Sequence, residues 1–158
     1  MSFERQKFKS HPDLQQNESV ESEEGLFEER ARFIRENYPG GKAKHDDIIR
    51  SALEGNDVIE EREADGSLNG LITYIIAPDN HKDLYCSIGV VVVREELRGE
   101  TDIAKNLLTK VLSKAQQADC NYCVAIADTP QGKNFLERNG FTEEIDKINK
   151  REYWRLEL

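Results

Sequence analysis

Two helices are predicted near the start of the chain from the spacing of its apolar residues. Between residues 23 and 38 most of these residues recur at steps of three or four, which places them on one helical face: Leu26, Phe27, Ala31, Ile34 and Tyr38. Pro39-Gly40-Gly41 ends this helix, because proline lacks the amide donor and glycine frees the backbone. A shorter helix is predicted over residues 46–53 and stops at Gly55-Asn56.

The hydrophobic period then changes to two, which is typical of β-strands. Residues 58–63 form the first predicted strand, and residues 70–77 form the second after a turn at Ala64-Asp65-Gly66. A third strand, 84–93, ends in four consecutive valines, and such a run suits a strand that is covered on both faces. We therefore expect residues 84–93 to lie in the middle of a sheet.

Helical spacing returns at Thr101, which can cap a helix with an apolar face. A strand over 122–127 follows, and then Asp128-Thr129-Pro130 begins another helix, which stops at Asn139-Gly140. Two strands, 141–145 and 152–158, close the chain. A strand meander followed by a crossover helix predicts an α/β (α+β) fold, with a mixed sheet and helices on both of its faces.

The 158 residues are enough for one domain, which we place at 23–158. Residues 1–22 are polar, and we predict a flexible N-terminal segment there, in which 3–8 can form a short edge strand. The formal net charge of −9 argues against nucleic-acid partners, which require clustered Lys and Arg. No apolar stretch has the length of a membrane span or the character of a signal peptide. We therefore expect no membrane partner and a cytoplasmic location.

The three cysteines, Cys86, Cys120 and Cys123, are interpreted as small buried residues. An odd number of cysteines without a secretion signal argues against a disulfide framework. The CxxC pair leads into a strand, whereas a redox CxxC motif begins a helix. No second CxxC and no histidine pair with ligand spacing is present, so we expect no metal site.

The segment with the clearest chemical content runs from Val90 to Leu112. A strand leads through a tight turn into an amphipathic helix, whose first N–H groups lack partners and whose dipole is positive at that end. Such a turn can bind an anion, and a guanidinium at Arg98 can hold a phosphate oxygen. Taken alone, this arrangement is common in proteins and identifies no ligand.

Two segments resemble motifs of the GNAT N-acetyltransferase superfamily. Val93-Arg94-Glu95-Glu96-Leu97-Arg98-Gly99, followed by Ile103-Ala104 and Leu107-Leu108, is similar to the acyl-CoA loop V-x-P-x-x-R-G-x-G-x-G/A and its helix. The stretch from Asp128 to Phe141 resembles the family segment N-x-x-A-x-x-x-Y-x-x-x-G-F. The order of elements from Leu26 to Leu158 also fits this superfamily.

The resemblance implies a mostly antiparallel central sheet in which two strands splay apart to form a cofactor cleft. The pantetheine arm of acetyl-CoA, or of another acyl-CoA, would pair with the central strand, and the pyrophosphate would lie on the loop at 98–104. A backbone N–H near Val92 or Val93 would polarise the thioester carbonyl. The cofactor-binding residues implied are Val91, Val92, Val93, Arg98, Gly99, Glu100, Thr101, Asp102, Ile103, Ala104 and Thr129.

Several positions depart from the family pattern. The loop proline is Glu95, and Asp102 would repel a pyrophosphate unless its side chain turns away to cap the helix. The tyrosine that often protonates the leaving thiolate corresponds to Leu136, and the asparagine corresponds to Thr129. These departures leave two functions open: an acetyl-CoA-dependent N-acetyltransferase, or a GNAT-fold binding or regulatory protein without catalysis. An acidic module that mimics nucleic acid is a third and weaker interpretation.

The acceptor implied by the resemblance is an amine, carried by a small molecule or by a protein. The first two helices and the loop 39–42 would hold it, and the net negative charge favours a basic acceptor. Tyr153 and Trp154 could line its pocket, although an aromatic pair at such a position is more often part of the core. No general base stands out. The polar residues of the central strand are Tyr85, Cys86 and Ser87, and Asp83 lies at its start. A homodimer is also left open.

Overall fold

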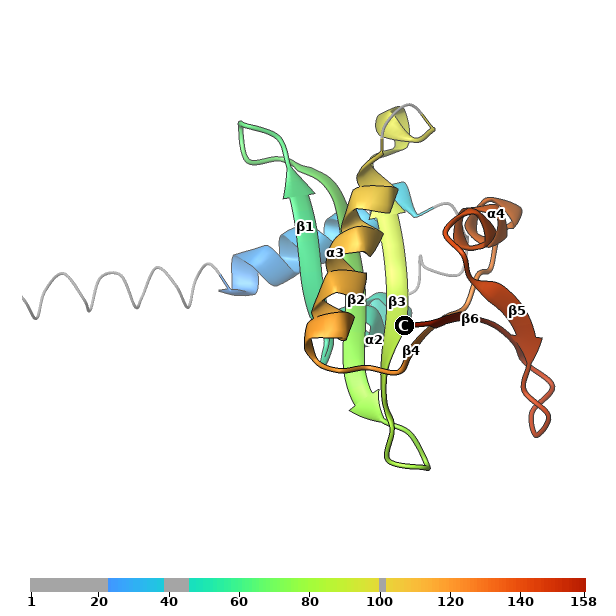
Figure 1. Ribbon diagram of the computed structural model, residues 1–158. Helices are drawn as coiled ribbons and strands as arrows, with labels where there is room; N and C mark the ends of the chain where they lie inside the picture. The colour runs from blue at the N-terminus through green and yellow to red at the C-terminus, as the bar shows by residue number, and fades with distance from the viewer. Residues whose placement is uncertain (1–22, 39–45, 100–101) are drawn as a thin grey trace, which may run out of the picture.

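The computed structural model describes residues 23–38, 46–99 and 102–158, and these form one six-stranded sheet with helices on both faces (Figure 1). The strands are β1 (Asp57–Arg62), β2 (Leu68–Pro78), β3 (Leu84–Val93), β4 (Tyr122–Ala125), β5 (Thr142–Ile145) and β6 (Glu152–Glu157), in the spatial order β1-β2-β3-β4-β6-β5. Every neighbouring pair is antiparallel except β3 with β4. The mixed and mostly antiparallel sheet is therefore confirmed, and so is the central place of β3.

The helices also follow the predicted pattern. They cover residues 23–37, α2 (Asp46–Leu53), η2 (Glu95–Leu97), α3 (Ile103–Gln117) and α4 (Pro130–Arg138). The predicted start of α4 at Asp128-Thr129-Pro130 is confirmed, and the Thr129 hydroxyl caps this helix by accepting a hydrogen bond from the Gly132 N–H at 3.0 Å. For α3 the prediction was wrong by one residue: Asp102, not Thr101, occupies the N-cap position, and its side chain makes no capping bond.

Two apolar clusters hold the helices on the sheet. Leu107, Leu108 and Val111 of α3 are buried against one face, whereas the 23–37 helix and α2 bury Ile34 and Ile49 against the opposite face. The valine run contributes to both clusters, because alternate strand residues point to opposite faces. This accounts for four consecutive valines in one central strand.

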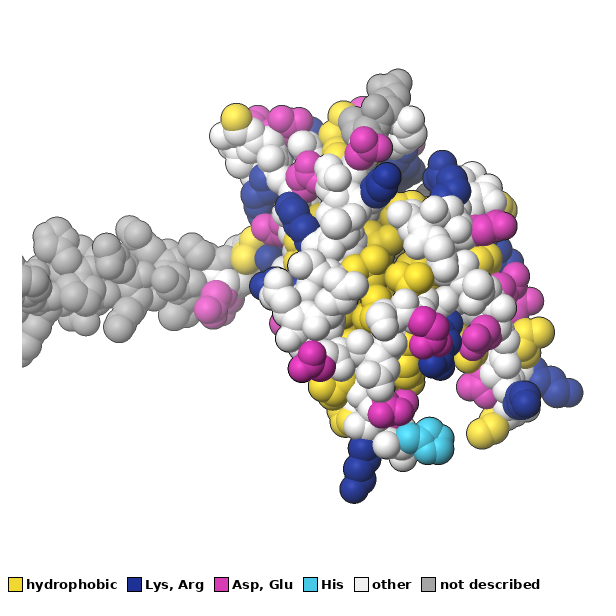
Figure 2. Space-filling model, in the orientation of Figure 1, with side chains coloured by type: hydrophobic (Ala, Val, Ile, Leu, Met, Phe, Trp, Pro, Cys, Tyr) yellow, Lys and Arg dark blue, Asp and Glu magenta, His cyan; other side chains and the backbone are white. Residues whose placement is uncertain are grey.

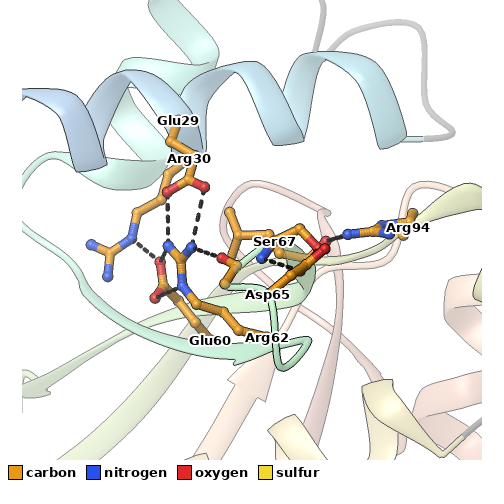
Figure 3. A network of polar contacts seen from close by, with 9 residues as sticks. Glu29, Arg30, Glu60, Arg62, Asp65, Ser67 and Arg94 are labelled. Carbon is orange, nitrogen blue, oxygen red and sulfur yellow. Dashed lines mark hydrogen bonds and ion pairs between the residues drawn. The ribbon is translucent and has the colours of Figure 1, made fainter.

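A polar network fixes the 23–37 helix to the edge of the sheet (Figure 3). Arg62 of β1 makes two hydrogen bonds, of 3.1 and 2.8 Å, to the carboxylate of Glu29. Glu60, also on β1, accepts from Arg30 at 2.7 Å and from Arg62 at 3.0 Å. The guanidinium of Arg94, just beyond β3, donates to the Leu68 carbonyl at 3.0 Å. The helix therefore has a defined position relative to the strands that it covers.

The three cysteines are buried and free, as predicted. Cys86 of β3 pairs in register with Cys123 of β4. The hydrogen bond between the two thiols, together with burial, raises the pKa of the Cys123 thiol, and burial raises the pKa of Cys120. Within the described ranges, no set of three His, Cys, Asp or Glu side chains is arranged to hold a metal ion. None of the helices in those ranges has the length and apolar character of a membrane span.

Candidate functional site: a cleft between diverging strands

The main cleft of the molecule begins where β3 and β4 part. The two strands pair only from Tyr85 to Ile88, opposite Tyr122 to Ala125. β3 then runs on to Val93, whereas the predicted strand 122–127 already ends at Ala125 and the chain turns toward α4. The space that opens has a volume of about 480 Å³. In Figure 2, hydrophobic side chains gather in a hollow at the centre of the visible face, and basic side chains lie along its upper rim.

A bulge in β3 lies at the point of divergence. Between the pairs Ile72–Val91 and Tyr74–Ile88, the two residues Gly89 and Val90 stand opposite the single residue Thr73. The Thr73 hydroxyl, which is fully buried, accepts a hydrogen bond from the Val90 N–H at 3.0 Å. Gly89 is required here, since a Cβ atom at this position would lie 2.3 Å from the Thr73 oxygen.

Beyond the bulge, one backbone edge of β3 has no neighbouring strand and faces the cleft. The Arg94 N–H donates to the Asn69 carbonyl of β2 at 2.8 Å, so the backbone groups of Val92, two residues back, also point to β2. The alternating residues Val91 and Val93 therefore direct their N–H and C=O groups to the other side, from which β4 has departed. The Val93 carbonyl accepts a hydrogen bond there from Arg98 Nε at 3.2 Å.

One end of the cleft is basic. Arg98 lies in the turn between η2 and α3, and Gly99 follows it with φ +78°, a conformation that favours glycine. Arg138, on α4, lines the cleft from the opposite wall. A second hollow of about 410 Å³ adjoins this end, and Asp102, Lys105 and Arg138 line it. The start of α3 and three cationic side chains thus converge at the open end between α3 and α4.

The opposite wall is formed by the β4–α4 connection and by α4. Ala127 and Thr129 line it from the connection, Phe135 and Leu136 line it from α4, and Leu136 is also part of the core. The hydroxyl of Thr129 is engaged in capping α4. Because Leu136 has no ionisable group, no proton donor stands at the position where the resemblance would have placed a tyrosine.

A polar pair closes the cleft on the side of the 23–37 helix. Tyr38 follows that helix, and its hydroxyl lies 3.5 Å from Oδ2 of Asp128, just before α4. The neighbouring Asn37 accepts a hydrogen bond from the Glu95 N–H at 3.0 Å, which ties the same helix end to the loop beyond β3. Burial, and after it the Asp128 carboxylate, raise the pKa of Tyr38, so its hydroxyl stays protonated and can donate.

The predicted cofactor residues fall into three groups. Those that line the cleft are Val91, Val93, Arg98, Gly99, Ala104 and Thr129. Val92 and Ile103 are buried and do not line it, and Asp102 faces the adjoining hollow. Glu100 and Thr101 lie outside the described residues. Of the two N–H groups expected to polarise a thioester, only that of Val93 points into the cleft, because Val92 is paired with β2.

The predicted acceptor residues are less well placed. Trp154 is a core residue, as the alternative interpretation of this aromatic pair had it, and Tyr153 donates to Glu144 at 2.6 Å, so neither lines the cleft. Tyr85 stacks on Tyr122 with the ring centroids 5.4 Å apart, in the part of the sheet where β3 and β4 remain paired. The loop 39–42 and the edge strand 3–8 lie outside the described residues.

Sequence reasoning did not assign a function to Asp128 or Tyr38. Asp128 was interpreted only as part of a helix start, and Tyr38 only as the end of an apolar stripe. One signal was available: Tyr38 immediately precedes Pro39-Gly40-Gly41-Lys42, the segment expected to hold the acceptor.

Several solved structures of GNAT-family acetyltransferases have a similar architecture. A GNAT-family acetyltransferase from Desulfovibrio desulfuricans superposes with a TM-score of 0.63 at 16% identity, covering 83% of this chain and 91% of the other. A GNAT family N-acetyltransferase from Escherichia coli in complex with CoA gives a TM-score of 0.65 at 12% identity, covering 83% and 75%. A chain of the NatC complex bound to Gag peptide and CoA gives 0.63 at 18% identity, covering 84% and 90%.

The protein therefore has the GNAT acetyltransferase fold, as its two sequence motifs suggested. No protein-family model matches the sequence, and no curated protein matches it either. The similarity of this chain to known proteins is therefore found in its three-dimensional structure, and it shows the fold.

Proposed function

We propose that the protein is an acyl-CoA-dependent N-acyltransferase that transfers an acetyl group from acetyl-CoA to an amine. One observation carries this proposal: a cleft of about 480 Å³ opens beside the unpaired edge of β3 and ends at a basic turn before α3. The E. coli and NatC structures, which contain CoA, support it through their similar fold.

The residues of the cleft fit the chemical groups of a coenzyme A molecule. The outward N–H and C=O groups of Val91 and Val93 can pair with the amides of the pantetheine arm, as a neighbouring strand would. Arg98 and the first amides of α3 suit the pyrophosphate. Asp102 does not line this cleft, so its carboxylate leaves the space free.

When bound, acetyl-CoA supplies an activated acyl group and a thiolate leaving group. The N–H groups of Val91 and Val93 face the cleft, and that of Val93 can stabilise negative charge on the thioester oxygen. The acceptor amine would approach from the side of Tyr38 and Asp128, since the basic turn occupies the other end. Solvent would return the proton to the thiolate, because Leu136 carries none.

A second candidate function is that of a GNAT-fold binding protein without catalysis. Leu136 at the cleft wall favours it, since this side chain has no proton to give. The two candidates agree on cofactor binding and differ in product formation.

The test begins with cofactor binding. Acetyl-CoA should raise the melting temperature in a saturable way, because a ligand that binds only the folded state stabilises it. Incubation with acetyl-CoA and a panel of primary amines should then release free CoA and give N-acetylated product, detected by mass spectrometry. Binding without product from any amine would favour the second candidate, and no melting shift at millimolar acetyl-CoA would contradict both.

We also propose a cytoplasmic location and an amine-bearing small molecule or protein as partner. Nucleic acid is not expected to bind, in view of the net charge of −9, and neither is a membrane, since no apolar stretch has the length of a span. Size-exclusion chromatography with light scattering tests whether the chain forms a homodimer.

A further inference from the structure

The acceptor side of the cleft combines one carboxylate with an apolar wall. Of the described residues that line the cleft, Asp128 is the only one with a carboxylate. Ile88, Val90 and Ile126 line the same space, and half of the Ile126 surface is exposed. A single negative charge beside exposed hydrocarbon is complementary to a cation that is carried on an apolar stem.

Asp128 is available to such a ligand. Among the residues that the structure describes, none forms an ion pair with it. Its side chain has one hydrogen-bond partner in those ranges, the Tyr38 hydroxyl at 3.5 Å. This separation exceeds the usual O–H···O distance of about 2.7 Å, so the bond is weak and leaves the carboxylate lone pairs open.

Tyr38 lies beside the Asp128 carboxylate and orients it only through this weak contact. Its hydroxyl can donate to Oδ2 of Asp128, while Oδ1 remains for a second donor. The adjoining Asn37 accepts from the Glu95 N–H, so the helix end that carries Tyr38 is fixed to the loop after β3. The Tyr38 end of the cleft therefore has a defined position relative to the outward backbone groups of Val91 and Val93.

We propose that this end of the cleft selects a primary alkylamine in its ammonium form, with Asp128 as the counter-ion, Tyr38 as its positioning residue and Ile126 against the alkyl stem. The inference rests on the proposed function, since it names the acceptor class of that transferase. Asp128 is exposed, so water at the bound nitrogen can take up the proton that the ammonium must lose before it reacts.

The experiment measures acceptor binding without any transfer reaction. Titrations followed by NMR compare n-hexylammonium with 1-hexanol, which has the same stem and no charge. Wild-type protein should prefer the ammonium by roughly fivefold, the ratio that corresponds to about 1 kcal/mol for a partly exposed ion pair. The Asp128→Asn variant should lose this preference while it still binds 1-hexanol.

Two further variants sharpen the result. Glu143→Gln removes an equal charge from an exposed position on β5 outside the cleft and should keep the full preference. Tyr38→Phe should lower the preference by a factor of about two, because the carboxylate is then less well held. Equal binding of the two probes to wild-type protein, or a preference that survives in Asp128→Asn, would overturn the proposal.

The outcome is separable from that of the proposed function. A preference for the ammonium that depends on Asp128, in a protein whose melting temperature acetyl-CoA does not shift, would leave the cation site standing and remove the transferase. A saturable acetyl-CoA shift without any ammonium preference would do the reverse.

Discussion

The two halves of β3 belong to one strand, yet they form different environments. From Tyr85 to Ile88 the strand is flanked by β2 and β4, and Cys86 and Ile88 are core residues. From Gly89 to Val93 it pairs with β2 alone, and its other edge lines the cleft. The difference comes from the partner: β4 ends after four residues, and the bulge opposite Thr73 bends the strand where the two separate. The edge of β3 that lines the cleft is free because the neighbouring strand β4 ends.

The largest effect is expected at the boundary between the two halves. Gly89→Val places side-chain atoms against Thr73, where even a Cβ would lie 2.3 Å from the hydroxyl oxygen. We expect a loss of about 3 kcal/mol in the free energy of unfolding, measured by urea denaturation. Gly25→Ala is the matched control, because a Cβ there meets nothing within 4 Å.

The close contact between Gly89 and Thr73 can also be tested with a double variant. Gly89→Ala and Thr73→Ala should each destabilise, and the double variant should be more stable than the sum of the two losses predicts, because the clash is removed. Additive losses would show that the bulge does not depend on this contact.

The second effect concerns the open half of the strand. Arg98→Ala should weaken CoA binding by about 1.5–3 kcal/mol, the range for hydrogen bonds to charged groups, and so by tenfold or more in the dissociation constant. Isothermal titration calorimetry measures it. Lys110→Ala, which removes an equal charge from the exposed side of α3, should bind CoA as the wild type does. Equal affinities in the two variants would remove Arg98 from the site.

A smaller effect is expected on the opposite wall. Thr129→Ala deletes the hydroxyl that caps α4 and should cost about 1 kcal/mol of stability. Thr109→Ala is the control, since Thr109 lies exposed within α3 and caps no helix end. Comparing the thermal stability of the two variants distinguishes the effect of losing a helix cap from the effect of losing a hydroxyl group.

The smallest effect is expected at the start of α3. Asp102→Asn should lower stability by about 0.3–1 kcal/mol, because a negative charge at a helix N-terminus is favourable. CoA affinity should rise slightly in the same variant, since the substitution removes a carboxylate near the turn that would hold the pyrophosphate. A fall in affinity would mean that Asp102 assists the cofactor.

The fold was largely predictable because its signals are local. The bounds of α2 and β3 were predicted to the residue, since Gly55 and Pro78-Asp79-Asn80 end the hydrophobic periods clearly. β4 was predicted two residues too long. Ile126 and Ala127 continue its apolar pattern, and only the divergence of the sheet removes their partner.

The site was predictable along the β3–α3 turn and not across the cleft. Arg98 and Gly99 belong to one contiguous motif, whereas Tyr38 and Asp128 are 90 positions apart in the sequence. Only the packing of the 23–37 helix brings these two side chains together, and no periodicity in a single sequence encodes that contact. The Val92 N–H cannot serve as a donor to the thioester because it points to β2. The hydrophobic pattern of the sequence does not determine which side of β3 faces β2.

The in-register pair Cys86 and Cys123 gives the strand junction its own chemical reporter. Both thiols are fully shielded in the core that packs against α3, and the thiol form is favoured at Cys123, so a thiol reagent can react with them only after this part of the core opens. Labelling rates followed by mass spectrometry therefore measure how often the core around the strand junction opens. Any ligand that bridges the two strands beyond Ile88 should slow that labelling without touching either sulfur atom.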